Sequence, residues 1–468
     1  MLRIINRISA IRSEHPLRIV AAVAMASSLV RAWLAHRYYG FQTGDDLEIA
    51  EEAFRRALGL VHSPWNVRSL LIPDVLVAPL VYLSHAIGIV DSRTLAEIAR
   101  YPFIVLSGVN ILLVFVLGRR WYGDSAAIIA SGLYAMNWMP LVYGSSLYPR
   151  TVAVTCILTA ATILTDGNSA KRAFLAGLLA ALAVTARYSE AIYFISLLLL
   201  QRREDRSAQH RTLPALAGGF LIGIAVTVGL YDRVTWGRWF GSLIEFAELT
   251  FVRGDASSAI AVQPPWWYLS NLPHWLPLSL LPGFIIAVRS TELRRAVAFI
   301  ALPVLTLSAI FHKELRYLQV VVPFVLLIAA HGFVIWWRQA NQRRLAALLL
   351  VLAVPLGLTH AGEVARRSTS AVDAALWIAS RRPSAVALSQ AWAYGGRLFL
   401  GNVVAITDVG LPPDPGLIRR IGPTLSALAV YSDDADDVLK AACAGNGLSE
   451  ATTFRHRGGR SVTVFFRP

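Results

Sequence analysis

Long apolar runs, separated by short arginine-rich links, make up most of the chain as far as residue 360. Most of these runs have roughly the 17 to 25 apolar residues that a helix needs to cross a bilayer. The pattern therefore predicts about eleven membrane-spanning helices, the first at 17–35. The others are expected at 101–117, 125–141, 149–164, 173–186, 191–200, 213–230, 268–288, 296–311, 318–337 and 345–360.

The links between these runs alternate in charge, which gives the chain a predicted orientation. Basic pairs occur in alternate links, at 119–120, 171–172, 202–203, 294–295 and 343–344. The positive-inside rule places these links and the basic N-terminus in the cytoplasm, and the loop 38–100 on the other side. The apolar segment 72–89 contains Asp74 and two prolines. Counting it as a span would invert every later link, so a surface or half-inserted helix is predicted there.

The chain changes character after residue 361. Apolar runs shorten to strand length between turn-rich links, with strands expected at 386–388, 403–406, 428–431 and 462–466 and helices at 371–380 and 435–444. The predicted fold is thus an all-α polytopic membrane protein with a small C-terminal α/β extracytoplasmic domain. We divide it into a transmembrane domain, 1–361, and the α/β domain, 362–468.

Composition narrows the class further. The 468 residues are 56% hydrophobic, which excludes an ordinary soluble protein. The formal charge of +15 comes from arginines in the links, so it reflects topology and does not predict a nucleic-acid partner. Only Cys156 and Cys443 are present, and they imply neither a disulfide framework nor a thiolate metal site.

The most informative stretch is the outer loop, 38–100. Gly44 breaks the preceding helix, and Asp45 and Asp46 begin an amphipathic segment that continues to Leu58. This pattern predicts a helix on the membrane surface with an acidic first turn. One interpretation is that these acidic residues do no more than complement the helix dipole. With Arg68 nearby, however, the turn is also a place where a base can meet a lipid-borne phosphate.

A second cluster of charge lies at 312–317, HKELRY, on a predicted outer boundary of the membrane. Lysine and arginine often anchor helix ends at an interface, with tyrosine beside them. These cations nevertheless lie on the outer side, where the positive-inside rule disfavours them, and the charge of Glu314 costs free energy at this boundary without anchoring the helix. A functional site is the second interpretation.

These segments, in order, resemble glycosyltransferase family 22, polyprenyl-phosphate-sugar-dependent enzymes of the GT-C superfamily. The segment 312–317 is similar to the family's HKE-x-R-F motif, and 43–46 (TGDD) stands where the family has HPDE. Further similarities occur at 65–73, 231–239 and 265–273. The resemblance implies a GT-C fold and an inverting transfer.

The resemblance also implies site residues. Asp45 is the expected base, with Asp46 as the alternative. The residues expected to bind the donor phosphate or substrate are Arg68, His312, Lys313, Glu314, Arg316, Trp65 and Asp232. Arg187 and Glu190 lie on the same predicted side and either join the site or pair with each other.

The predicted function is therefore transfer of mannose, or a similar hexose or pentose, from a polyprenyl-phosphate-linked sugar to a lipid-linked or glycan acceptor on the outer face. The expected partners are these substrates and membrane lipids, with no nucleic acid, no cofactor and no obligatory metal. Arginine and alanine richness favours a bacterial inner membrane. The alternatives are a transporter or flippase of a lipid-linked saccharide, and a scaffold protein with a sensor-like tail.

Overall fold

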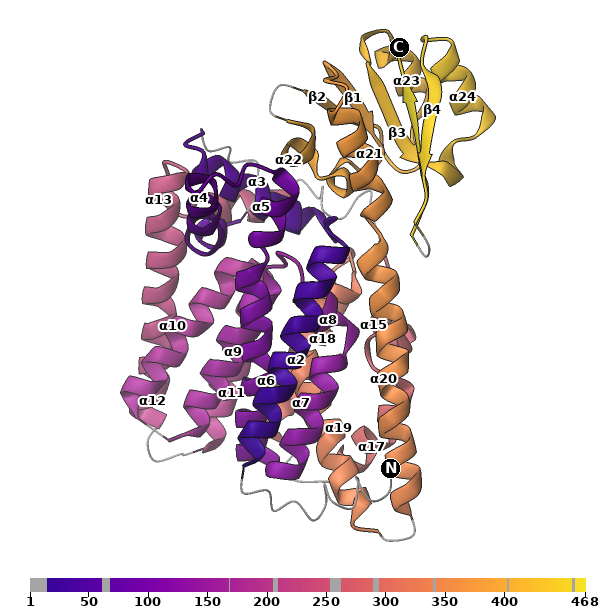
Figure 1. Ribbon diagram of the computed structural model, residues 1–468. Coiled ribbons are helices and arrows are strands. Elements are labelled where there is room, and N and C mark those ends of the chain that lie inside the picture. The colour runs from indigo at the N-terminus through magenta and orange to yellow at the C-terminus, as the bar shows by residue number, and fades with distance from the viewer. Residues whose placement is uncertain are drawn as a thin grey trace.

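The computed structural model shows a helical bundle with a small α/β domain at one end (Figure 1). It describes residues 15–60, 68–167, 169–204, 209–252, 262–288, 294–339, 342–401, 404–456 and 459–468.

The bundle is built from the longer helices. They are α2 (Pro16–Arg37), α6 (Tyr101–Tyr122), α7 (Asp124–Met136), α9 (Arg150–Thr165), α10 (Ala170–Ala186), α11 (Ile192–Glu204), α12 (Gln209–Ile224), α17 (Leu281–Val288), α18 (Arg294–Ala309), α19 (Val322–Trp337) and α20 (Arg343–Arg366). After α12 the chain continues through η3 (Ala225–Leu230) into α13 (Tyr231–Thr235). The same apolar periodicity that predicted the spans thus forms helices.

Four helical stretches in the described part of the chain are long and apolar enough to cross a membrane: Pro16–Arg37, Ser92–Tyr122, His210–Thr235 and Arg343–Ala379. Six shorter apolar helices accompany them, at Ile72–Ala86, Arg150–Thr165, Tyr188–Gln201, Leu278–Val288, Arg295–Ala309 and Val322–Trp337. The chain is therefore an integral membrane protein with several apolar helices, and the number of about eleven spans stays a prediction.

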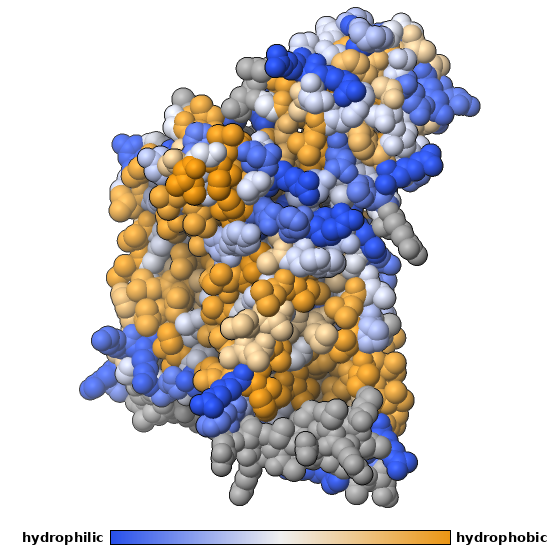
Figure 2. Space-filling view, in the orientation of Figure 1, coloured by the Kyte–Doolittle hydropathy of each residue, from blue (hydrophilic) through white to orange (hydrophobic). Residues whose placement is uncertain are grey.

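The two ends of the bundle differ. The α/β domain lies at the end where α2 finishes, whereas α2 and α20 both begin at the opposite end (Figure 1). In Figure 2, hydrophobic residues gather over the middle of the bundle, and hydrophilic residues gather toward its ends and across the junction with the α/β domain. This distribution is typical of a protein whose bundle lies in lipid.

Short elements cover the end of the bundle that carries the α/β domain. In Figure 1, α3 (Gly44–Ala57), α4 (Ala78–Ala86) and α5 (Ser92–Ile98) lie there, and a π-helical turn, η1 (Ile72–Val77), leads into α4. The segment predicted as a surface or half-inserted helix is thus a helix beside α3, and Leu83 and Ile87 on it are exposed.

The remaining short elements of the bundle lie in its links. They are α8 (Trp138–Tyr143), η2 (Tyr188–Ala191), α14 (Gly241–Ala247), η4 (Glu248–Val252), α15 (Trp267–Ser270), α16 (Leu272–Trp275), η5 (Leu278–Leu280) and η7 (Leu315–Leu318).

The C-terminal domain contains a five-stranded sheet of order β2-β1-β3-β5-β4. Its strands are β1 (Ala385–Leu388), β2 (Ala405–Asp408), β3 (Ala427–Tyr431), β4 (Ser449–Phe454) and β5 (Val462–Phe466). The first three are mutually parallel, and β5 runs antiparallel to β3 and β4. The helical elements of the domain are α21 (Thr369–Ala379), η9 (Ala391–Tyr394), α22 (Gly396–Leu400), α23 (Pro415–Ile421), η10 (Gly422–Thr424), η11 (Ser432–Asp434) and α24 (Asp437–Ala444).

The four predicted strands and both predicted helices of this domain are confirmed, within a few residues at their ends. The edge strand β4 was not predicted, because its sequence, SEATTF, is mostly polar and lacks an apolar run. An edge strand with one exposed face tolerates such residues.

Close helix packing in the bundle depends on glycine. A Cβ atom added to Gly332 in α19 would collide with the carbonyl group of Gly283 in α17. We expect Gly332→Ala to lower the free energy of unfolding by about 1 to 3 kcal/mol, because the two backbones must separate. Thermal unfolding in detergent measures the effect. The matched control is Gly132→Ala in α7, where a Cβ meets no atom within 4 Å, and equal stability of the two variants would contradict the expectation.

Candidate active site

The acidic turn lies at the start of α3, as predicted. Thr43 has extended backbone and caps the helix, with its hydroxyl accepting a hydrogen bond from the backbone N–H of Asp46. Asp45 and Asp46 occupy the first turn, where negative charge is favoured by the helix dipole. The cap fixes the direction of both carboxylates.

Asp46 is buried within this turn. Its carboxylate accepts hydrogen bonds from the Thr43 hydroxyl at 2.8 Å and from the backbone N–H of Gln42 at 3.1 Å, and the residue is 0% exposed. Burial raises the pKa of Asp46 above its usual value. These contacts favour a role in holding the turn.

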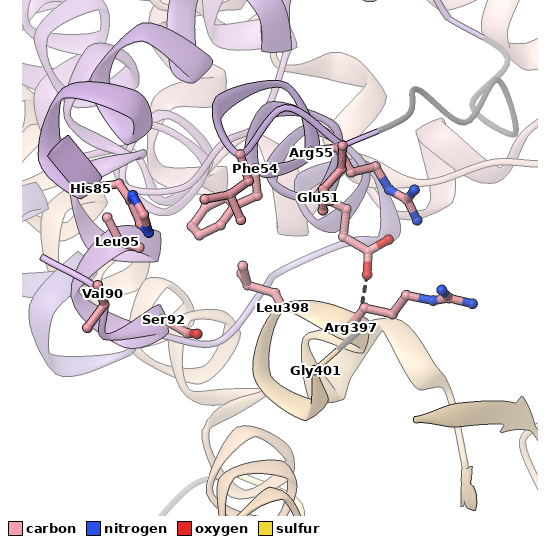
Figure 3. A pocket seen from close by; sticks show the side chains of 12 residues that line it. Glu51, Phe54, Arg55, His85, Val90, Ser92, Leu95, Arg397, Leu398 and Gly401 are labelled. Atoms are coloured by element: carbon pink, nitrogen blue, oxygen red, sulfur yellow. Dashed lines mark hydrogen bonds between the residues drawn. The ribbon is translucent and has the colours of Figure 1, made fainter. Parts of the chain in front are cut away.

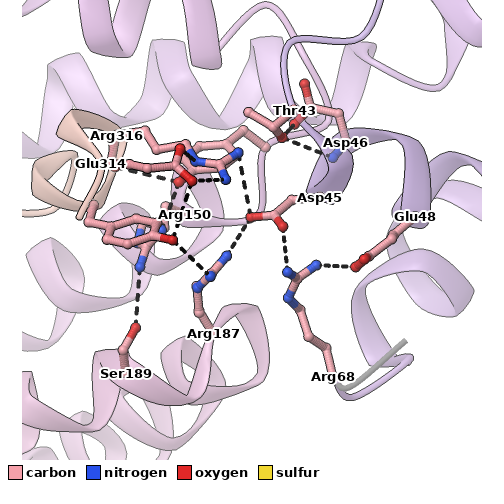
Figure 4. Close-up of polar contacts among 12 residues, drawn as sticks. Thr43, Asp45, Asp46, Glu48, Arg68, Arg150, Arg187, Ser189, Glu314 and Arg316 are labelled. Atoms are coloured by element: carbon pink, nitrogen blue, oxygen red, sulfur yellow. Dashed lines mark hydrogen bonds and ion pairs between the residues drawn. The ribbon is translucent and has the colours of Figure 1, made fainter. Parts of the chain in front are cut away.

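Asp45 points the other way, into a group of arginines (Figure 4). One carboxylate oxygen accepts from Arg68, and the other lies 2.5 Å from Nη1 of Arg187. Nη1 of Arg316 is 3.9 Å from the same second oxygen, beyond hydrogen-bonding distance. Arg68 also donates to Glu48, one turn along α3. Three guanidinium groups from distant parts of the chain thus surround one carboxylate.

These arginines dominate the electrostatics of Asp45. Burial by itself raises the pKa of a carboxyl group, but the positive charges of Arg187, Arg68 and Arg316 lower the pKa of Asp45 far below its usual value. Asp45 is therefore a carboxylate at any physiological pH, and as long as all three arginines face it, it is a weak base.

The segment 312–317 reaches Asp45 through Arg316. Arg316 also pairs with Glu314, with its Nη2 at 2.7 Å from the carboxylate, and His312 contacts that carboxylate at 3.0 Å. Burial raises the pKa of Glu314, but Arg316 and His312 outweigh it and hold that pKa at about 2. The side chain of Glu314 is 31% exposed against 8% for Asp45, so Glu314 lies nearer the opening of the site.

A further arginine, Arg150, supports this arrangement from the first residue of α9. Its Nε lies 2.6 Å from Glu190, and it donates to the Tyr148 hydroxyl at 2.7 Å. The centre of the Tyr317 ring lies 4.5 Å from the guanidinium carbon of Arg150 and 5.0 Å from that of Arg187. Such cation–π contacts hold the arginines in place without neutralising them.

The loop before α3 is held from two sides. Arg100 is almost fully buried, and its guanidinium donates to the carbonyls of Tyr39 and Gly40 at 2.6 and 3.0 Å. On the other side, the Ser368 hydroxyl donates to the carbonyl of Phe41. A Cβ on Gly40 would lie 2.7 Å from that of Ser368, so glycine permits the close approach.

The C-terminal domain adds a contact to the same loop. The Tyr39 hydroxyl donates to Asp373 in α21, and His456 lies 2.5 Å from the other oxygen of that carboxylate. The position of Asp45 therefore depends on residues more than 300 positions away along the chain.

Two other predicted site residues, Lys313 and Asp232, make their hydrogen bonds away from Asp45. The ammonium group of Lys313 donates to the carbonyls of Gln263, at 2.9 Å, and Ile310, which ties two links together. Asp232 is buried and accepts from the backbone and hydroxyl of Ser242 at 2.8 and 2.5 Å. Trp65 lies outside the described residues. Substrate roles for these three residues stay predictions.

Sequence reasoning did not single out Arg100, Arg150 or Glu48. A signal for the two arginines was present, because each immediately precedes or begins an apolar helix at the predicted outer side, where a cation is unexpected. Of the two alternatives for Arg187 and Glu190, the structure shows Arg187 in the site and Glu190 paired with Arg150. Among the described residues, no group of three or more His, Cys, Asp or Glu side chains is placed to hold a metal ion.

Comparison with known proteins identifies the family. Residues 60–376, well over half of the chain, match the Alg9-like mannosyltransferase family. The chain belongs to this family. This is a family of glycosyltransferases, as the resemblance implied. The match begins after the acidic turn, so the role of Asp45 rests on geometry.

A curated relative and two solved structures are also similar to this chain. The GPI alpha-1,2-mannosyltransferase 3 of Xenopus laevis is 29% identical over 187 residues, which are 38% of this chain and 34% of that protein. ArnT from Cupriavidus metallidurans bound to undecaprenyl phosphate has a TM-score of 0.61 at 13% identity, covering 96% of this chain and 97% of ArnT. Arabinofuranosyltransferase AftD from Mycobacteria has a TM-score of 0.55 at 13% identity, over 96% of this chain and 40% of AftD. At such identity the structures establish a shared GT-C fold.

The contact between Tyr39 and Asp373 leads us to expect an effect of the C-terminal domain on activity. We expect Asp373→Ala to lower the transfer rate by about 3- to 10-fold, because Tyr39 loses its acceptor and a loop shift misplaces Asp45. Asp437→Ala, an exposed change in the same domain, is the matched control. A transfer assay in detergent, with the melting temperature of each variant, measures it, and wild-type activity of Asp373→Ala would refute this role.

Proposed function

We propose that the protein transfers mannose, or a similar hexose or pentose, from a polyprenyl phosphate to a hydroxyl group of a lipid-linked or glycan acceptor, with inversion at the anomeric carbon. The observation that carries this proposal is the single buried carboxylate of Asp45 among Arg68, Arg187 and Arg316. The family supports mannose as the sugar.

The arginines are the proposed site of the donor phosphate. A sugar linked to polyprenyl phosphate is a phosphodiester with one negative charge, and it gains a second as the sugar leaves. Planar guanidinium groups suit phosphate oxygens, and in a site sheltered from water they stabilise the charge that develops in the transition state. Nη1 of Arg316 lies 3.9 Å from Asp45, beyond hydrogen-bonding distance, and we expect it to donate to such an oxygen. ArnT, which shares the fold, was solved with undecaprenyl phosphate, which supports a polyprenyl carrier here.

Asp45 is the proposed base. The acceptor oxygen attacks the anomeric carbon opposite the phosphate, and the bond from that carbon to the phosphate oxygen breaks. Asp45 takes the proton of the attacking hydroxyl, and polyprenyl phosphate departs with the bonding electron pair. The phosphate is a good leaving group, so the step needs no second acid.

Donor binding would also activate this base. In the free protein, three guanidinium charges hold Asp45 as a weak base. A bound phosphate shares those charges, which weakens their effect on Asp45 and raises its pKa toward the ordinary carboxylate range. The carboxylate thus becomes a better proton acceptor when a donor is bound.

The end of the bundle that carries Asp45 is the proposed outer face. Helix α20 begins with Arg343 and Arg344 at the opposite end, and basic residues also close α6 there, at Arg119 and Arg120. The positive-inside rule places that opposite end in the cytoplasm. The α/β domain and the acceptor then lie on the outer side of the membrane. Composition favours a bacterial inner membrane as the location of the protein.

Replacement of the base tests the mechanism. We expect Asp45→Asn to lower kcat by about 10²- to 10⁴-fold, because no carboxylate remains to take the proton from the attacking hydroxyl group. The donor KM should stay equal or fall, since a competitor of the phosphate for the arginines has lost its charge. Radiolabelled polyprenyl-phosphate mannose and a membrane lipid extract supply the assay. Asp124→Asn, at the opposite end of the bundle, is the control, and a kcat for Asp45→Asn within 3-fold of wild type would exclude this base.

The pH dependence tests the activation by donor. The pKa of Asp45 in the free protein is lowered, so the carboxylate stays charged as pH falls and kcat/KM should be flat down to the ordinary carboxylate value of about 3.9. In the donor complex that pKa is higher, so kcat should decline at a higher pH. Profiles of both constants between about pH 3 and pH 8, with the folded state of the protein checked at each pH, provide the measurement. Coincident acid limbs of the two profiles would argue against charge sharing.

A further inference from the structure

A cavity of about 210 Å³ lies beside helix α3, between the bundle and the C-terminal domain (Figure 3). Its walls come from the second half of α3, from α4 and α5 with their link, and from α22. It is lined by Glu51, Phe54, Arg55, Leu58, Leu60, His85, Val90, Ser92, Leu95, Arg397, Leu398 and Gly401.

The cavity has a polar end and an apolar end. Figure 3 shows Glu51, Arg55 and Arg397 together at one side, with Val90 and Leu95 at the other. The carboxylate of Glu51 accepts a hydrogen bond of 2.9 Å from the backbone N–H of Arg397, so the side chain of Arg397 is not used in that contact. The side chains of two arginines, Arg55 and Arg397, therefore lie beside the carboxylate of Glu51 at the polar end of the cavity.

The apolar end is continuous with surface that suits lipid. Leu58 and Val90 in the lining are 42% and 69% exposed, and Ile87, at the end of α4, is 77% exposed. Exposed apolar side chains beside a cationic rim, on helices at the end of a membrane bundle, are typical of the boundary between headgroups and acyl chains. An occupant of the cavity can thus keep its chains in the membrane.

The cavity lies close to the proposed base. Glu51 follows Asp45 by six residues on α3, a rise of about 9 Å along the helix axis. Asp45 faces the arginine group, whereas Glu51 faces the cavity. Helix α3 therefore connects the cavity directly to the site of transfer, with one face turned to each.

We propose that this cavity binds the headgroup of the lipid acceptor, and that the headgroup carries both a phosphate and hydroxyl groups. This inference rests on the proposed function. Arg55 and Arg397 attract the phosphate, Glu51 accepts hydrogen bonds from hydroxyl groups, and Leu58 and Val90 contact the start of the acyl chains. The volume is below the roughly 300 to 1,000 Å³ of sites for larger ligands, so one ring and its phosphate fit, and further sugars extend toward Asp45.

Binding of a soluble lipid tests the proposal directly. The probe is dihexanoyl phosphatidylinositol, which has a phosphate and a hydroxylated ring, titrated calorimetrically into full-length protein in maltoside detergent. We expect saturable binding, weakened at least 10-fold by Arg55→Gln combined with Arg397→Gln and abolished by Leu58→Trp, which fills the cavity. Dihexanoyl phosphatidylcholine and inorganic phosphate serve as comparison ligands, and both should bind at least 10-fold more weakly.

Matched variants keep the test specific. Arg419→Gln with Arg420→Gln, on exposed α23, removes the same charge elsewhere and should leave binding unchanged. Equal binding of the two lipids, equal binding of phosphate alone, or no effect of the Arg55 and Arg397 changes in a folded protein would each overturn the proposal. Asp45→Asn should still bind the probe, so loss of transfer in that variant concerns the base and does not bear on the cavity.

Discussion

The structure is organised around one unfavourable requirement, which is to keep a carboxylate and several guanidinium groups together away from water. A buried charge without a partner is strongly destabilising, so each arginine near Asp45 has an acidic partner. Arg68 pairs with Asp45 and Glu48, Arg316 with Glu314, and Arg150 with Glu190. The charges of this group are balanced without a substrate. In the proposed mechanism a bound phosphate shares the arginines, and this competition links phosphate binding to the basicity of Asp45.

The balance is useful only if the groups cannot move apart. Aromatic rings and main-chain carbonyls supply that rigidity. The ring of Tyr317 contacts two guanidinium groups, and Arg100 donates to carbonyls of the loop that leads to α3. The α/β domain completes the hold through Ser368 and Asp373. The domain therefore helps to fix the geometry of the candidate active site.

The two faces of α3 give this helix a double role. Its first turn presents Asp45 to the arginine group, and its later turns form a wall of the amphipathic cavity beside α22. One rigid helix thereby sets the distance between the proposed chemistry and the proposed acceptor headgroup. A helix transmits such a distance well, because its rise per residue is fixed by the backbone.

The sequence by itself determined the features that depend on local periodicity and charge. These are the apolar helices, the amphipathic helix after Gly44, and most of the α/β domain. The resemblance of separate motifs also pointed to Asp45, Arg68 and Arg316, which the structure brings together. Only the tertiary structure decided the partners of each charge, since Arg187 meets Asp45 across 142 residues and Tyr39 meets Asp373 across 334. It also directed Lys313 to main-chain carbonyls. No local pattern encodes such pairings, because they arise when helices pack and each buried charge takes the nearest compensating group.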